Sequence, residues 1–317
     1  MNTSNQKMRA AQIHSFGGLA HLEIQNIEIP TPGEGEVLVK VHAAAVNPVD
    51  WKIREGYLAE IIPHQLPLTL GWDFAGEIVS VGKSVNSWSI GEAVYARPDL
   101  AKNGAFAEYI LVSEKEIAAK PKSLNWQKSA AVPLVTLTAW QSLKDIGNIK
   151  QGDRVLIHAG AGGVGIAAIQ LAKLAGATVY TTASTRNIEF LKTLGADHII
   201  DYTQQDFSDL SNLDMVFDTL GGDVLQKSWP TLKQGGCLVS IAEVPNDEIA
   251  TQHQVNAHFC FVQANPDQLA EIAKLIDSEL LKIEIDSVFK LEDLAKAQQK
   301  SETGHVRGKI VIQVEEE

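Results

Sequence analysis

The sequence predicts an α/β protein in which a doubly wound parallel sheet is joined to a second, β-rich domain. Strand patterns alternate with helix patterns over residues 131–284, strand-like segments dominate before them, and a strand pattern returns at the carboxyl end. The chain has 317 residues, 45% of them hydrophobic, which is enough for about two domains. We therefore expect a β-rich domain at 1–130, a sheet-and-helix domain at 131–284, and a return to the first domain at 285–317.

The first part of the chain has the composition of β-strands. Glu36–Val46 and Gly76–Gly82 are rich in β-branched residues and lie among Gly and Pro. The segment Asn47–Gly56 instead has the features of a short helix, with an asparagine suited to the N-cap, a proline after it and a glycine at its end. Within it Asp50 and Arg54 are spaced for an i,i+4 ion pair.

The second part of the chain alternates between the two kinds of element. Asp153–Gly165 contains an apolar strand that runs directly into glycines, and a helix of small apolar residues follows and stops at Gly176. Because helices separate these strands, the sheet should be parallel. The other expected elements are a strand at Ala177–Thr182, a helix at Asn187–Leu194, strands at His198–Tyr202 and Asp214–Asp218, and a last strand at Gly308–Val314.

The glycines after the apolar strand predict a dinucleotide site. Gly160, Gly162 and Gly165 have Gly-x-Gly-x-x-Gly spacing between a strand and a helix, with Gly163 and Val164 inside the motif. Glycines there allow a tight turn, and the amides at the helix start can bind a pyrophosphate. A nucleotide triphosphatase loop is excluded because no Gly-Lys-Ser/Thr ends the run. The alternative is a structural turn without a ligand.

The chain lacks an acid where an NAD site needs one. About 20 residues beyond the glycines, the carboxylate that would bind the ribose 2′-hydroxyl of NAD is replaced by Ser184, with Arg186 two residues later. A carboxylate would repel a 2′-phosphate, whereas a hydroxyl and a guanidinium can bind it. This favours NADPH as the cofactor. The alternative for Arg186 is a solvated residue at a helix start.

Composition excludes some other classes of function. A net charge of -12 and a pI near 5.2 argue against binding nucleic acid through its phosphates. The sequence contains no apolar run of the roughly 20 residues that span a bilayer, and Met1–Lys7 is polar, so we expect a cytoplasmic protein that does not bind membranes. Cys237 and Cys260 are expected to be reduced thiols in the core. None of the nine histidines has metal-ligand spacing, and His158 is expected to be a hydrogen-bonded core residue.

Motifs along nearly the whole chain resemble the medium-chain dehydrogenase/reductase superfamily. Within the superfamily, the chain resembles the zinc-free quinone oxidoreductase and enone (alkenal/one) oxidoreductase branch. This resemblance implies a GroES-like fold for the β-rich domain and a Rossmann fold for the other domain. The motifs are Asn47-Pro-Val-Asp50, Leu70-Gly-Trp-Asp-Phe-Ala-Gly-Glu77, Gly104-Ala-Phe-Ala-Glu-Tyr109, Thr138-Ala-Trp140, the glycine loop, Phe217-Asp-Thr219 and Gly304-His-Val-Arg-Gly-Lys309.

The resemblance also implies that no zinc is bound. Zinc alcohol dehydrogenases of the superfamily have Cys and Gly-His-Glu where this chain has Asn47 and Gly71-Trp72-Asp73. The cysteine-rich lobe that holds their structural zinc is missing between Gly91 and Glu108. Because a catalytic zinc needs about three protein ligands, these replacements leave too few.

By the same resemblance, several residues are expected at the active site. Lys52 is the leading catalytic candidate, beside the nicotinamide ribose and the substrate carbonyl, with Asn47 in the same pattern and Tyr57 as a weaker candidate proton donor. The cofactor residues carried over are Lys52, Thr138, Tyr202, Ile241, Ala242, Phe261, Val262 and Lys309. Each also has an ordinary structural interpretation: packing for the apolar residues, and a solvated charge for Lys309.

The sequence thus favours a zinc-independent, NADPH-dependent reductase of the C=C bond of α,β-unsaturated carbonyls, or of quinones. Two alternatives are an NADPH-binding sensor or scaffold with little turnover, and an enoyl-thioester reductase. The expected partner is a small enone or quinone. The oligomeric state stays open, with a homodimer formed through an edge strand as the form common in the superfamily.

Overall fold

The computed structural model describes residues 6–315, and its contacts divide the chain into two compact units. Unit 1 holds the residues up to Leu134, together with 264–279 and those from Glu284 onward. Unit 2 comprises Val135–Gln263 and Leu280–Ile283. The units differ from the expected domains chiefly at 264–279, which we expected beside the cofactor sheet and which group with unit 1.

Unit 2 is built on a six-stranded sheet of order β11-β10-β9-β12-β13-β14 in which all neighbours are parallel. Numbered along the chain, this is the doubly wound order 3-2-1-4-5-6, so the predicted fold class is confirmed here. The strands are β9 (Arg154–Ile157), β10 (Thr178–Ala183), β11 (His198–Asp201), β12 (Leu213–Asp218), β13 (Leu232–Ser240) and β14 (Asn256–Phe259).

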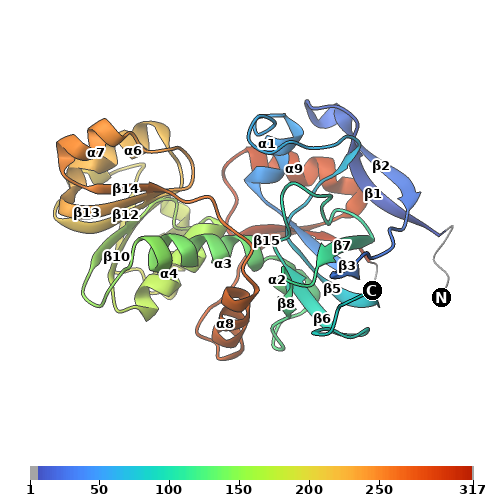
Figure 1. Ribbon diagram of the computed structural model, residues 1–317. Coiled ribbons are helices and arrows are strands. Elements are labelled where there is room, and N and C mark those ends of the chain that lie inside the picture. The colour runs from blue at the N-terminus through green and yellow to red at the C-terminus, as the bar shows by residue number, and fades with distance from the viewer. Residues whose placement is uncertain (1–5, 316–317) are drawn as a thin grey trace. The chain divides into compact units, whose positions relative to one another are not determined.

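Helices follow the strands of unit 2 and cover the sheet. In Figure 1, α4 lies on one side of the sheet and α6 and α7 lie on the other. Leu225 of α6 and Ala250 of α7 pack with Leu238 of β13, which buries apolar surface that water would otherwise contact. The helices are α4 (Gly163–Leu174), α5 (Ile188–Thr193), α6 (Gly222–Ser228) and α7 (Asp247–His253), with 3-10 turns η3 (Thr185–Asn187), η4 (Phe207–Asp209) and η5 (Trp229–Thr231).

Unit 1 is the β-rich part of the molecule, as predicted. Its larger sheet has seven strands in the order β15-β16-β3-β5-β6-β8, with β7 also paired to β3, and its smaller sheet has the order β2-β1-β4. The late strand β16 pairs antiparallel with β3, so both ends of the sequence build one sheet. The strands are β1 (Lys7–Ile13), β2 (Leu22–Glu28), β3 (Glu36–Val46), β4 (Leu68–Thr69), β5 (Phe74–Val81), β6 (Ala93–Ala96), β7 (Tyr109–Ser113), β8 (Ala118–Ala119), β15 (Ile285–Lys290) and β16 (Lys309–Gln313).

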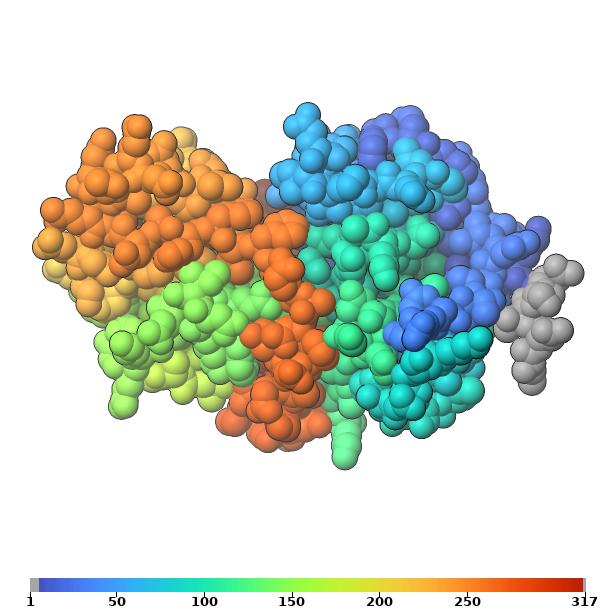
Figure 2. Space-filling model, viewed as in Figure 1, coloured from blue at the N-terminus to red at the C-terminus, as the bar shows by residue number. Residues whose placement is uncertain are grey.

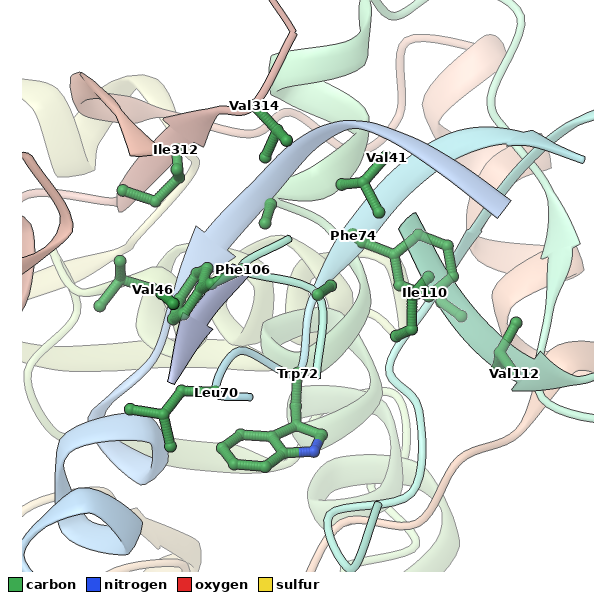
Figure 3. Close-up of a cluster of buried hydrophobic side chains, with 14 of the residues drawn as sticks. Val41, Val46, Leu70, Trp72, Phe74, Phe106, Ile110, Val112, Ile312 and Val314 are labelled. Carbon is green, nitrogen blue, oxygen red and sulfur yellow. The ribbon is translucent and has the colours of Figure 1, made fainter. Parts of the chain in front are cut away.

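The core of unit 1 gathers side chains from distant parts of the sequence (Figure 3). Leu70, Trp72 and Phe106 are fully buried in it. Gly71 has a φ of +98°, and a Cβ at this position would lie 2.6 Å from the Phe106 ring, so only glycine fits there. Two backbone hydrogen bonds, from Ala105 N to Gly71 O and from Phe106 N to Leu70 O, hold the two segments together. This contact explains the glycine of the Leu70–Glu77 motif.

Short helices complete unit 1. Helix α8 is amphipathic, with Leu269, Ile272 and Ile276 buried, and the Tyr95 hydroxyl donates to Leu269 O at 2.6 Å. Its solvent side forms part of the surface in Figure 2. None of the helices among residues 6–315 combines the length and the apolar character that a membrane span requires. The helices are α1 (Pro48–Arg54), α2 (Trp126–Ala130), α8 (Pro266–Asp277) and α9 (Leu294–Glu302), with 3-10 turns η1 (Leu19–His21) and η6 (Leu291–Asp293).

One helix continues from unit 1 into unit 2. Helix α3 (Pro133–Trp140) begins with Pro133 and Leu134, the last two residues of the first segment of unit 1. It continues into a π-helical segment, η2 (Gln141–Ile146). Single-turn π segments are rare and often occur at functional sites.

His158 is a core residue of unit 2, as predicted. Its ring is fully buried directly after β9, with Nδ1 3.2 Å from the Thr182 hydroxyl and Nε2 3.0 Å from the Ser228 hydroxyl. Burial lowers the pKa of this imidazole to about 4, so it is neutral near pH 7.

This histidine should make the fold sensitive to acid. As the pH falls below about 6.5, the unfolded chain takes up a proton that the folded chain refuses, and this favours unfolding. When the pH falls from 7 to 5, the buried His158 should lower the free energy of unfolding by about 2 kcal/mol. We expect urea titrations at the two pH values to show a smaller loss in His158→Gln than in the unmodified protein. Equal losses in the two proteins would contradict the assignment.

Candidate active site

The expected cofactor residues of unit 2 follow the carboxyl ends of its strands. Ser184 comes directly after β10 and Tyr202 directly after β11, while Ile241 comes directly after β13 and is followed by Ala242. Phe261 and Val262 lie just beyond β14. Because carboxyl ends of parallel strands share one edge, the structure brings these residues to the edge where the glycine loop leaves β9.

The glycines of the loop have different reasons to be glycine. A Cβ on Gly160 would lie 2.1 Å from the Thr181 hydroxyl, and one on Gly165 would lie 2.4 Å from Ala159 O, so packing within the protein excludes larger residues. A Cβ on Gly162 would meet only Ala159 O, at 3.4 Å, which is an ordinary contact. The protein itself therefore does not require Gly162, and a Cβ there would take space that a bound group can use.

The loop leads into the start of α4. Gly162 is the N-cap of this twelve-residue helix, and Gly163 and Val164 form its first turn, which contains no acidic residue. The partial positive charge of the helix start is thus not offset by a neighbouring carboxylate of that turn. This arrangement fits the pyrophosphate of a dinucleotide.

The expected 2′-phosphate region contains a carboxylate that the sequence analysis did not consider. Ser184 is half-buried and Arg186 is exposed, and between them the Thr185 hydroxyl donates to Asp201 Oδ2 at 2.5 Å. Asp201 also accepts from the amide and hydroxyl of Thr203. The hydrogen bond from Thr185 is the main reason that the pKa of Asp201 is lowered, so this group is an anion. The residue before Arg186 is therefore hydrogen-bonded to a negative charge at the end of the neighbouring strand β11.

Asp218, which we did not expect as a functional residue, organises two loops at the same edge. Its carboxylate is fully buried at the end of β12 and accepts from the amide of Gly221 at 3.0 Å and from the Ser240 hydroxyl at 2.7 Å. Ser240 in turn accepts from the amides of Ala242 and Glu243, both at 3.2 Å. A buried carboxylate that accepts several hydrogen bonds holds the loops after β12 and β13 in one arrangement.

Gln141 is a second residue that the sequence analysis missed. Its Nε2 donates to Gln263 O and its Oε1 accepts from Gln263 N, both at 2.9 Å, so one side chain binds the main chain at two points. This fastens the segment of Phe261 and Val262 to the helix that carries Thr138, whose own side chain is buried. The available signal was a glutamine directly after the Thr138-Ala-Trp140 motif, but its partner is 122 residues away.

In unit 1, Asn47 begins helix α1 with a capping box. The Asp50 carboxyl group accepts from Asn47 N at 2.6 Å, and the Asn47 side chain accepts from the amide of Asp50. Asn47 Nδ2 donates to Asp73 Oδ2 at 2.9 Å and to Ala45 O at 3.4 Å, and Oδ1 accepts from Lys309. The side chain is 1% exposed. The expected contact of Asn47 with the reacting groups is thus replaced by contacts inside the protein, which orient the helix.

Lys309 is also placed differently from our expectation. Its ammonium donates to Val46 O at 2.9 Å, to Asn47 Oδ1, and to Asp73 Oδ2 at 3.3 Å. An ammonium has three hydrogens, and three protein acceptors surround this one in a fully buried place. The phosphate contact expected of Lys309 therefore has no support in the geometry.

Burial and the ion pair have opposite effects on the pKa values of Asp73 and Lys309. Burial raises the pKa of Asp73 and lowers that of Lys309, and the ion pair counteracts both changes. Asp73 Oδ1 additionally accepts from Leu134 N, at 2.8 Å. Since only donors face Asp73, we assign it as the carboxylate. Burial raises the pKa of Asp50 to about 8, so Asp50 keeps its proton at neutral pH and the cluster carries no net charge.

The ion pair expected between Asp50 and Arg54 is not formed, so that prediction was wrong. Arg54 is buried and donates to Gly17 O at 3.1 Å, to Gln298 Oε1 at 2.7 Å and to Glu302 Oε1 at 2.9 Å. Asp50 instead closes the capping box. Apart from Glu55, the next residue, the partners of Arg54 come from segments far away in the sequence, so the i,i+4 spacing alone was misleading.

Lys52, Trp51 and Tyr57 form a group at the end of α1. The Lys52 ammonium lies 5.8 Å from the centroid of the Trp51 ring, within the range of a cation–π contact. The Tyr57 ring stands edge-on to Trp51 at 6.2 Å, its amide donates to Lys52 O at 3.0 Å, and its side chain is 68% exposed. Lys52 on the helix and Tyr57 just after it thus both contact the Trp51 ring, in contrast to the buried Asn47.

Comparison with known proteins supports the fold and shows the family. Residues 33–122 match the family model described as alcohol dehydrogenase GroES-like domain, and residues 194–312 match that of zinc-binding dehydrogenase. The chain is 33% identical to the chloroplast envelope quinone oxidoreductase homolog of Arabidopsis thaliana, over 96% of this chain and 98% of that protein. This chain is a medium-chain dehydrogenase/reductase.

Other relatives place this medium-chain reductase in the quinone and enone oxidoreductase branch. It is 36% identical to the NADPH-dependent alkenal/one oxidoreductase of Arabidopsis thaliana, over 97% of this chain and 80% of that one. It superposes on the quinone oxidoreductase of Coxiella burnetii with a TM-score of 0.93, at 40% identity over 98% of this chain and 100% of that one. The protein is therefore an oxidoreductase that uses a nicotinamide cofactor and a small-molecule substrate.

The donor set of this reductase does not fit the zinc that one family description mentions. Asn47 is bound to Lys309 and Asp73, and the Trp72 indole is fully buried and donates to Lys102 O at 3.2 Å. A buried ammonium among these groups would repel a divalent cation. Over the described part of the chain, no three His, Cys, Asp or Glu side chains gather in a group suited to a metal ion. We derive no chemistry from zinc.

Proposed function

We propose that this protein is a zinc-independent, NADPH-dependent reductase of the C=C bond of α,β-unsaturated carbonyls, or of quinones. The observation that carries the proposal is the cluster of Asn47, Asp73 and Lys309, where an ammonium and an amide replace metal ligands. Without a Lewis-acid metal, the carbonyl oxygen of the substrate needs another electrophile. Lys52 is the available cation of the group on α1.

The residues of unit 2 support a dinucleotide with a 2′-phosphate. The start of α4 and the open side of Gly162 would hold the pyrophosphate, and Ser184 and Arg186 would hold the 2′-phosphate. Phe261 and Val262 would line the nicotinamide pocket, fastened by Gln141.

The proposed chemistry uses a hydrogen-bond donor where negative charge develops. Bound NADPH supplies a hydride, which adds to the β-carbon of the substrate. The Lys52 ammonium would donate to the carbonyl oxygen as negative charge gathers on it, and this lowers the barrier by electrostatic stabilisation. Tyr57 is exposed and next to Trp51, so its hydroxyl is a candidate source of the proton that the α-carbon takes up.

We also propose a cytoplasmic location and leave a homodimer as the expected assembly. Cys237 and Cys260 are both free thiols, which suits a reducing compartment. Strands β11 and β14 form the two edges of the unit 2 sheet, and either edge can pair with a second copy.

Steady-state assays should show oxidation of NADPH with substrates of the proposed class. The panel would contain short alkenals, cyclic enones, quinones, an enoyl-thioester and, as a negative control, saturated aldehydes. We expect turnover with enones or quinones and none with the saturated aldehydes. Turnover with the enoyl-thioester alone would favour the alternative reductase. Tight binding of NADPH without turnover on any member would favour a sensor or scaffold.

The cofactor preference should depend on Arg186. We expect NADPH to bind at least tenfold more tightly than NADH, which corresponds to about 1.4 kcal/mol. Arg186→Ala should remove most of that preference by weakening NADPH and not NADH, because only NADPH has the phosphate. Fluorescence titrations of both cofactors would measure this, with Lys192→Ala, an exposed lysine nearby in the sequence, as the control. Equal affinities in the unmodified protein would contradict the assignment of Ser184 and Arg186.

Lys52→Ala should slow the chemical step much more than it weakens cofactor binding. Loss of one donor to a developing oxyanion costs about a hundred- to a thousandfold in rate. Single-turnover absorbance of NADPH would measure the step, and titration would give the dissociation constant. The control is Lys115→Ala, an exposed lysine on the loop after β7. An unchanged single-turnover rate would contradict the catalytic role and leave Lys52 as an ordinary surface lysine.

A further inference from the structure

Helix α1 carries Lys52, the proposed catalytic lysine. Helix α1 has only seven residues, and an isolated helix of that length is unstable in water. Its geometry therefore depends on contacts with the rest of unit 1. Lys52, which lies in the last turn, has no ion-pair partner among the described residues and is positioned through the helix backbone.

The start of this helix is bound from several sides. The backbone amide of Asn47 donates to Asp50, its Nδ2 donates to Asp73, and its Oδ1 accepts from Lys309. Lys309 also donates to Val46 O, the residue before the cap, at 2.9 Å. One buried ammonium thus holds both the end of β3 and the first residue of the turn into α1.

Asp73 extends the same network to a second helix. Its Oδ2 accepts from Lys309 and Asn47, and its Oδ1 accepts from the amide of Leu134, in the first turn of α3. The carboxylate is fully buried. A buried ion pair is expensive to desolvate, and well-packed apolar residues are often at least as stabilising. A contribution to folding stability is therefore a weak explanation for this buried ion pair. The need to hold the attached segments in one defined geometry is a sufficient explanation.

We propose that Lys309 and Asp73 are positioning residues for reduction, and that their buried ion pair sets the place of Lys52 by holding Asn47 at the start of α1. This inference rests on the proposed function, because Lys52 is assigned there. Neither residue contacts the reacting groups. Lys309 acts through Asn47, and Asp73 holds both the ammonium and the Asn47 amide.

The test separates geometry from stability with a neutral pair. Lys309→Met and Asp73→Asn each remove one charge of the pair and leave the other in place, whereas the double variant Asp73→Asn/Lys309→Met removes both. The matched control is Asp293→Asn/Lys296→Met, the same substitutions at an exposed ion pair of unit 1 with a 2.7 Å contact. Four quantities are measured on each full-length protein: the urea midpoint, the dissociation constant of NADPH, the single-turnover rate with an enone, and hydrogen exchange of the α1 amides.

We expect both single variants to lower the urea midpoint and the double variant to recover most of it. The single-turnover rate of the double variant should nevertheless stay at least tenfold below that of the unmodified protein, with the NADPH dissociation constant within threefold. The amides of residues 51–54 should exchange faster in the double variant, while those of α4 are unchanged. The control pair should leave all four quantities as they are.

The outcomes are distinguishable even if the proposed function is wrong. A double variant with a recovered midpoint, protected α1 amides and a full rate would overturn the positioning role. Faster α1 exchange at a recovered midpoint in a protein that reduces nothing in the substrate panel would support the role in holding α1 and refute the reductase. If the single variants do not fold, the double variant carries the test, and if it also fails to fold, the pair is a structural requirement and the proposal is overturned.

Discussion

The buried ion pair between Lys309 and Asp73 is the contact on which the site in unit 1 depends. A charge that is removed from water must find partners, and these two groups bind Val46 O, the Asn47 side-chain amide and Leu134 N as well as each other. The segments that meet there are the end of β3, the turn into α1, the start of α3 and strand β16. A network of this kind has one satisfied arrangement, so it specifies geometry more than it adds stability.

In unit 2 a buried carboxylate also holds neighbouring segments together, at the edge of the sheet. Asp218 is as deeply buried as Asp73, and it too accepts hydrogen bonds from main-chain amides and from a side chain of the next strand. Ser240 passes this constraint on to the amides of Ala242 and Glu243. In both units a buried carboxylate orders the loops, whereas the groups proposed to meet ligands, such as Lys52 and Arg186, lie nearer the surface.

The proposal that this member of a superfamily that includes metalloenzymes works without a metal is consistent with these constraints. The cluster at Asn47 already contains a cation, the ammonium of Lys309, and it is electrically balanced by Asp73. A second cation there would be repelled. Under the proposed function, the electrophile for a carbonyl oxygen is Lys52, on the helix that begins at this cluster. The proposal thus separates a buried cation that orients the helix from a less buried cation that meets the substrate.

Local sequence was sufficient for the fold and for the cofactor loop, because those depend on periodicity and on glycine. The alternation of apolar strands and helices predicted the doubly wound sheet, and the spacing of Gly160, Gly162 and Gly165 predicted the turn after β9. The N-cap at Asn47 was predicted for the same reason, because a cap depends on residues next to it in the sequence, whereas the part of Asp50 in the capping box was not predicted.

Only the tertiary structure decided which charges are buried together. Lys309 reads as a solvated residue of a carboxyl-terminal strand, yet it is buried against Asp73 and Asn47, 236 and 262 residues away. Arg54 has an acid at helical spacing and binds Gln298 and Glu302 instead. A local pattern shows which partners a charged side chain can reach within its own helix or turn. It does not show which distant strand or helix will surround that side chain and remove the water that would otherwise solvate it.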